Sequence, residues 1–122
     1  MPENPAPIVV AFLVPTVDNE TRKAHPVALW TALETALVSR FGGLTRKAGV
    51  RGQWIDGEGR LIREPSRSYE VDVAAEKLPA VRALLSGACA AFGQNCLRAT
   101  FEGRAYYLNP DATQVAPHGL AL

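Results

Sequence analysis

The order of strand-like and helix-like segments is the feature that most limits the folds open to this chain. The first segment, IVVAFLV at residues 8–14, is a continuous apolar run rich in β-branched residues, which is typical of a buried strand. From Pro26 to Phe41 the apolar residues instead recur every three or four positions, which predicts a helix that Gly42 and Gly43 end. The remaining patterns predict two strands, a second helix and another strand, at residues 44–55, 60–73, 76–92 and 96–101.

Strand, helix, strand, strand, helix, strand is the order of a ferredoxin-like α+β sandwich. We therefore expect an antiparallel sheet with both helices on one face, with strands one and three in its centre. RAYYL, at residues 104–108, predicts a further C-terminal strand. The 122 residues suit a single domain over residues 1–122, and its aperiodic ends, about residues 1–7 and 110–122, are expected to be loose.

Such a sheet has one face that the two helices leave uncovered. The first strand nevertheless has apolar residues on both of its sides, which indicates that both faces are buried. A second subunit or the C-terminal tail is expected to cover the open face. A homodimer formed in this way would bury on the order of 1,200–2,000 Å².

Composition excludes several classes of partner. The net charge of +1 provides no general field for nucleic acid or an anionic membrane, and the seven-residue apolar run is too short to span a bilayer. The start, MPENPAP, has an acid and three prolines where a signal peptide has basic residues. The strands also lack the aromatic signature of RNA-binding domains with this strand order. We expect a cytoplasmic protein that binds neither nucleic acid nor membrane.

Metal and cofactor chemistry is not indicated either. Cys89 and Cys96 lie seven residues apart, which matches no zinc or redox spacing, and we expect both thiols to be structural and free of a disulfide. No group of His, Cys and carboxylate residues has metal-ligand spacing. No glycine-rich loop joins a strand to a helix, since DGEG at residues 56–59 lies between two strands and reads as a hairpin turn.

A proline inside the second strand of the hairpin restricts its geometry. Pro65 cannot donate to a ladder, so we expect the distal hairpin, about residues 52–64, to project beyond the sheet and the chain to bend at Pro65. The central strand then runs over residues 68–73, with the set Tyr69, Val71 and Val73 facing the helices. In simple register Glu70 lies opposite Arg46, and a bulge at Pro65 would shift this pairing by one residue.

Three motifs in this region resemble those of a known group of proteins. FGGLT (41–45), GQW with a later glycine (52–59) and REPSRSY (63–69) match an F-G-G-x-T, W-x-x-x-x-G, E-x-S-x-x-Y pattern. The pattern resembles that of small bacterial hypothetical proteins of unknown function. The resemblance implies a small α+β domain and brings no known activity, so no residue roles follow from it.

The hairpin also carries the candidate site. A site at the bend could bind a small anion or carboxylate through its arginines, while the alternative is exposed ion pairs worth roughly 0–1 kcal/mol each. Trp54 is expected either to stack on a ligand or to pack against Ile62 across the hairpin. The candidate ligand or interface residues are Arg46, Trp54, Arg63, Glu64, Ser66, Arg67, Tyr69, Glu70 and Tyr106.

Two functions are compatible with these patterns. We expect first a non-catalytic module that dimerises or binds a protein through its open sheet face and hairpin. The alternative is a small-ligand protein or cofactor-free enzyme with a polar pocket between the open face and the hairpin at residues 52–67. In that alternative Glu64 or Glu70 is the expected acid/base, because enclosure raises a carboxylate pKa toward neutrality.

Overall fold

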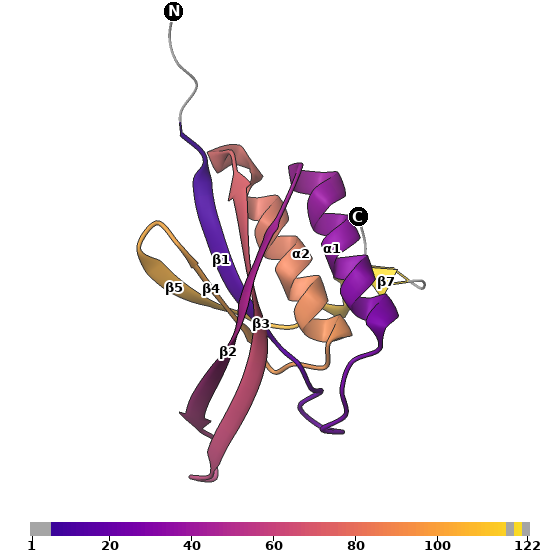
Figure 1. Cartoon of the computed structure of the whole chain (residues 1–122), viewed down its shortest axis with the longest axis vertical. Helices are drawn as coiled ribbons and strands as arrows, with labels where there is room; N and C mark the ends of the chain where they lie inside the picture. Colours follow the sequence, from indigo (N-terminus) through magenta and orange to yellow (C-terminus); the bar gives the residue numbers. More distant parts are fainter. Residues whose placement is uncertain (1–5, 117–118, 121–122) are drawn as a thin grey trace, which may run out of the picture.

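The computed structural model describes residues 6–116 and 119–120. Its principal elements are β1 (Ile8–Pro15), α1 (Val27–Phe41), β2 (Thr45–Ile55), β3 (Leu61–Val73), α2 (Leu78–Ala91), β4 (Leu97–Phe101) and β5 (Arg104–Leu108). The five strands form one antiparallel sheet in the order β2-β3-β1-β4-β5, and both helices lie on one face of it (Figure 1). The predicted α+β, ferredoxin-like order is confirmed, and the predicted extra strand is β5.

The core lies between the sheet and the two helices. From the sheet it takes alternate residues of the central strands, and the Phe12 and Tyr69 rings stack there with centroids 5.3 Å apart. Trp30 of α1 is 7% exposed and packs against Phe92, which follows α2. Cys89 is buried in the same core and forms no disulfide. Alternation along each strand therefore decides which side chains face the helices.

The other face of the sheet is open within a single chain. Val9 of β1 is 48% exposed, and Ala11 and Leu13 are only half-buried. The expectation that β1 is buried on both faces is thus not met by this chain alone.

The described part of the C-terminal tail does not cover the open face. Its described residues form a short turn, Ala112–Gln114, and the ladder of β6 (Val115–Ala116) with β7 (Gly119–Leu120), and these contact the helices. Figure 1 shows β7 beside α1, on the helix side of the sheet. The looseness expected of the two ends stays a prediction, and residues 1–5, 117–118 and 121–122 lie outside the described part.

The hairpin departs from the simple register. A bulge lies between Lys47 and Val50 of β2, so Glu70 pairs with Thr45, and Arg46 pairs with Tyr69 instead. The predicted Glu70–Arg46 pairing is wrong because β2, rather than the segment around Pro65, holds the extra residue.

Pro65 lies inside the continuous strand β3. Its carbonyl accepts the amide of Thr16 at 3.0 Å, just beyond the last β1–β3 pair, Pro15 with Ser66. The nitrogen of an antiparallel strand residue faces the same neighbour as its carbonyl. The nitrogen of Pro65 therefore faces Thr16, and the bond that it cannot donate lies beyond the last β1–β3 pair, so the ladder of β1 with β3 is not interrupted. Beyond this point only β2 and β3 continue, and the hairpin projects as predicted (Figure 1).

Within the described residues, neither helix is long and apolar enough to cross a membrane.

Candidate functional site

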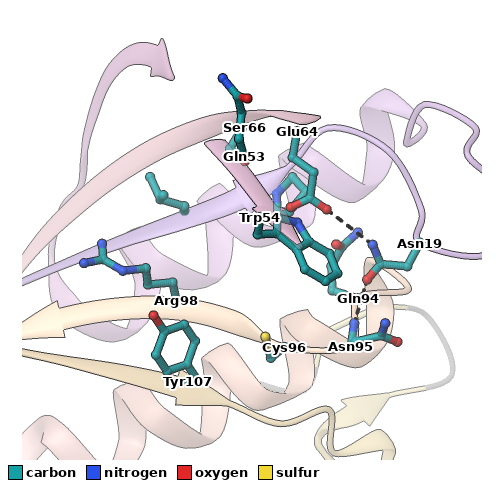
Figure 2. A pocket seen from close by; sticks show the side chains of 12 residues that line it. Asn19, Gln53, Trp54, Glu64, Ser66, Gln94, Asn95, Cys96, Arg98 and Tyr107 are labelled. Carbon is teal, nitrogen blue, oxygen red and sulfur yellow. Dashed lines mark hydrogen bonds between the residues drawn. The ribbon is translucent and has the colours of Figure 1, made fainter. Parts of the chain in front are cut away.

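A cavity of about 430 Å³ lies at one end of the open face, beside the projecting hairpin. Figure 2 shows it with Trp54 and Glu64 on the hairpin side and Arg98, Cys96 and Tyr107 on the side of β4 and β5. Its lining comes from β1, the loop after β1, the hairpin, the segment after α2, β4 and β5. The lining residues are Leu13, Pro15, Asn19, Gln53, Trp54, Glu64, Ser66, Gln94, Asn95, Cys96, Arg98 and Tyr107.

Strand alternation places the hairpin residues of this cavity. Trp54 pairs with Ile62, and Glu64 and Ser66 follow on the same face of β3 at intervals of two residues. Gly52 stands opposite Glu64. Trp54 is 40% exposed, lies opposite Ile62 in the strand pairing and lines the cavity. Its stacking on a ligand stays a prediction.

Glu64 is held by a chain of hydrogen bonds from two loops. The Asn19 Nδ2 atom donates to Glu64 Oε2 at 3.4 Å, and the backbone amide of Asn95 donates to Asn19 Oδ1 at 2.7 Å (Figure 2). The Asn19 amide in turn donates to the carbonyl of Gly93 at 3.0 Å. Asn19 is thus fixed from its backbone and its side chain, which orients one carboxylate oxygen of Glu64.

The loop that carries Asn19 has its own anchors. The Asp18 carboxylate accepts the amides of Glu20 and Thr21 at 2.8 and 2.9 Å, and the bonds from Thr21 and Glu20 lower the pKa of Asp18. Gln94, which is 4% exposed, donates through Nε2 to the carbonyl of Val17 at 2.7 Å. These hydrogen bonds therefore hold the loops that form this wall of the cavity in a fixed conformation.

Cys96 borders the cavity as a neutral thiol. Although the residue as a whole is exposed, partial desolvation raises the pKa of its thiol above the ordinary value, and the charge of Glu64 adds to this effect. A thiol with a raised pKa is protonated at neutral pH, and only the thiolate is a strong nucleophile. Cys96 is therefore suited to packing against a ligand and not to attacking one.

The cavity combines an aromatic face with both signs of charge. Trp54 offers a ring for stacking, Glu64 an acceptor, and Arg98 a fork of donors. Tyr107, which is 63% exposed, borders the cavity from β5. Such a site suits an organic molecule that has a flat ring, hydroxyl or amine donors, and an anionic or acceptor end.

Three of the nine candidates from the sequence line this cavity: Trp54, Glu64 and Ser66. The other six do not. Glu70 lies on the open face outside the cavity, where its Oε1 pairs with Lys47 Nζ at 2.7 Å. Tyr106 stacks on Phe101 at 4.1 Å, on the helix side of the sheet. Arg63 occupies the other face of the hairpin, and it is exposed.

Arg46, Arg67 and Tyr69 meet at Glu34 of α1, on the helix face. The Tyr69 hydroxyl donates to Glu34 Oε2 at 2.8 Å, and the guanidinium groups of Arg67 and Arg46 lie 3.3 and 3.6 Å from the same oxygen. The Arg67 guanidinium also stacks on Trp30, 4.0 Å from the ring centroid. We call these five residues the Glu34 cluster. It ties α1 to β2 and β3 and lines none of the cavity.

Sequence reasoning missed the residues that the loops supply. Asn19, Gln94 and Asn95 lie in aperiodic segments, where no pattern predicts a spatial neighbour. Arg98 had a usable signal, because it alternates with the apolar residues Leu97 and Ala99 of a predicted strand and so had to face away from the helices. Among the described residues, no group of three or more His, Cys, Asp or Glu side chains is arranged to hold a metal ion.

Fold and site together define a ferredoxin-like α+β domain with a ligand-sized cavity on its open face. No protein-family model matches the chain, and no curated protein matches it. Two solved structures share the fold. A phage SAM lyase in complex with S-methyl-5'-thioadenosine superposes with a TM-score of 0.65 at 15% identity, over 89% of this chain and 95% of that chain. A phage SAM lyase in the apo state gives 0.63 at 15%, over 91% and 96%.

These findings correct the first functional expectation. Both of these solved structures are of an enzyme, a phage SAM lyase, and a cavity of this chain lies between the open face and the hairpin. The interpretation as a non-catalytic interaction module is therefore wrong. The alternative, a small-ligand protein or cofactor-free enzyme with a pocket in that place, is the one that the findings favour.

Proposed function

We propose that this chain binds an adenine nucleoside with a sulfur substituent, a thioether or its sulfonium parent, and cleaves the sulfonium form without a cofactor. The observation that carries the proposal is the cavity in which Trp54 and Glu64 face the open end of a fold shared with a SAM lyase. The ligand class follows the S-methyl-5'-thioadenosine of that phage enzyme. A cytoplasmic location and the resemblance to the bacterial hypothetical proteins stay predictions from the sequence.

The dimensions and chemistry of the cavity support a nucleoside. A volume of about 430 Å³ falls within the roughly 300–1,000 Å³ typical of sites for small organic ligands. The Trp54 ring is available for a purine to stack on, and base–aromatic stacking contributes about 1–3 kcal/mol. Glu64 accepts hydrogen bonds, which suits the hydroxyl groups of a ribose. Its negative charge also attracts a sulfonium cation.

The charge change of a sulfonium cleavage fits this set of residues. When the bond between carbon and a sulfonium sulfur breaks, its electron pair goes to sulfur and a neutral thioether leaves, so the leaving group needs no proton. In an elimination the other fragment forms a double bond and gives up one hydrogen as a proton. Glu64 is the carboxylate of the cavity that takes this proton. Arg98 supplies donors for the carboxylate of the amino-acid part of the substrate.

Calorimetric titration with S-methyl-5'-thioadenosine tests the binding. Trp54→Ala is expected to weaken the affinity by about 5–150-fold, the equivalent of one stacked base. Ile55→Ala is the matched control, because Ile55 is the next residue of β2, is 62% exposed and lies outside the cavity. Absence of binding to the wild-type protein, or equal affinity of both variants, would contradict the proposed ligand.

Incubation with S-adenosylmethionine tests the reaction. Mass spectrometry of the products is expected to show S-methyl-5'-thioadenosine, with its formation slowed by about 10²–10⁴-fold in Glu64→Gln. Glu58→Gln is the control, since Glu58 is an exposed acid at the hairpin tip outside the cavity. The second product separates elimination from attack by the carboxylate of the substrate itself. Equal rates in Glu64→Gln and Glu58→Gln would remove Glu64 from the mechanism.

A further inference from the structure

We propose that a second copy of this chain packs on the open sheet face and covers the cavity. The packing itself is argued from the sheet alone, while its role as the cover of a ligand site rests on the proposed function.

The open face is a distinct apolar surface of the described chain. Its exposed apolar residues come from three strands: Val9 of β1 is 48% exposed, Val50 and Trp54 of β2 are 39% and 40% exposed, and Tyr107 of β5 is 63% exposed. Strand pairing puts all four on the side away from the helices. Single exposed apolar residues are ordinary, whereas a group of them on one face marks an interaction surface.

The centre of this face allows a close, flat approach. Ala11 of β1 pairs with Thr100 of β4, and Ser68 of β3 pairs with Leu13 of β1, and none of these four residues is charged. The charged residue among them is Glu70, which lies opposite Ala11 on β3 and is paired with Lys47. A mostly uncharged centre with a polar and aromatic border is the arrangement found in protein–protein interfaces.

The charges on this face favour a copy of the same chain as the partner. The face carries three acids, Glu64, Glu70 and Asp72, and two bases, Lys47 and Arg98. The signs are mixed, and Lys47 and Glu70 are already paired at 2.7 Å. A strongly acidic or basic partner therefore has no complementary surface here. A two-fold dimer brings the same mixed surface to itself and lets bases meet acids.

The area of the face is large enough for such a dimer. Five strands spaced about 4.8 Å apart give a width of about 24 Å, and the eight residues of β1 extend about 26 Å. This amounts to about 600 Å² on each copy and about 1,200 Å² in total, the lower end of the range for specific interfaces. The described part of the C-terminal tail lies against the helices, so it does not compete for this face.

The cavity opens on the same face, next to the border formed by Trp54 and Tyr107. A second copy on this face therefore reduces the access of water to a ligand near Trp54, and a ligand bound there gains contacts from it. We infer that ligand affinity and dimer formation are coupled.

Sedimentation of the full chain without ligand tests the dimer. The wild-type protein is expected at twice 13.1 kDa, and Ser68→Glu at 13.1 kDa, because it puts two like charges at the centre of the interface. Ser39→Glu, the same change at an exposed position of α1, is expected to stay dimeric. Thr100→Glu repeats the test should Ser68→Glu fail to fold. A wild-type monomer, or a dimer that persists in folded Ser68→Glu and Thr100→Glu, overturns the proposal.

Titration with S-methyl-5'-thioadenosine then tests whether the second copy covers the cavity. The affinity of Ser68→Glu is expected to be at least about tenfold lower than that of Ser39→Glu. Equal affinities would show that the second copy does not close the site. A wild-type monomer that binds the ligand refutes the dimer and leaves the proposed function standing. A wild-type dimer that binds no ligand refutes the proposed function and leaves the dimer standing.

Discussion

The Glu34 cluster provides a sharp test of how this fold is held together, because a single carboxylate oxygen serves three partners. Tyr69 is fully buried as a residue, and its hydroxyl donates to Glu34 at 2.8 Å. Glu34→Ala removes the acceptor and leaves a hydroxyl in the protein interior without it, which costs about 1–3 kcal/mol. The ion pairs with Arg46 and Arg67 are partly exposed and add only about 0–1 kcal/mol each. We expect a total loss of about 2–3 kcal/mol in the free energy of unfolding.

A double-mutant cycle with Tyr69→Phe separates the hydrogen bond from the other effects. Tyr69→Phe alone removes the donor, while Glu34 keeps its arginine neighbours, so it is expected to cost about 0.5–1.5 kcal/mol. In Glu34→Ala/Tyr69→Phe no hydroxyl is left without an acceptor. The double variant is therefore expected to lose at least about 1 kcal/mol less than the two single losses together.

Urea unfolding of the four proteins measures this coupling, and thermal unfolding is expected to show Glu34→Ala about 8 °C below the wild type. Thr35→Ala is the control for a change at an exposed neighbouring position of α1, and it is expected to stay within about 0.5 kcal/mol of the wild type. Additive losses within about 0.3 kcal/mol, or a Glu34→Ala protein as stable as Thr35→Ala, would refute the assignment of the cluster as the tie between α1 and the hairpin.

Two further predictions concern the same framework. Burial raises the pKa of the Tyr69 phenol above its ordinary value, and Glu34 adds to this, although Arg67 opposes it. A group whose pKa is higher in the folded than in the unfolded state stabilises the fold at pH values below the unfolded pKa. This contribution of Tyr69 is therefore lost as the pH rises above about 10. In urea unfolding, the stability difference between the wild type and Tyr69→Phe is expected to shrink there. Gly93→Ala is expected to destabilise more than Gly42→Ala by roughly 1 kcal/mol or more, because both have positive φ but only at Gly93 does an added Cβ collide with the Asp18 carboxylate. Equal melting temperatures of the two glycine variants would contradict this.

Periodicity was sufficient for the strand order and for the faces of the central strand β3. The alternation of Tyr69, Val71 and Val73 with polar residues predicted the helix side of β3 correctly, because one buried face makes strand register costly to change. The residues of the cavity could not be predicted from periodicity in the same way. Glu64 was visible as a polar residue beside a proline, but Asn19, which orients it, is 45 residues away in a loop whose path depends on Asp18 and Gly93. No local pattern encodes such a long-range contact.

The bulge in β2 explains why Arg46, one of the six expected residues outside the cavity, faces the helices. Between the hairpin tip and the bulge, Trp54 and Val50 face the open side, and without an extra residue Arg46 would do so too, opposite Glu70. The bulge between Lys47 and Val50 exchanges the faces of the sheet on which Arg46 and Lys47 lie. Lys47 comes to the open face and pairs with Glu70, while Arg46 turns to the helices and reaches Glu34. One inserted residue thereby turns Arg46 away from the open face. Glu64 is the one carboxylate among the described residues that line the cavity.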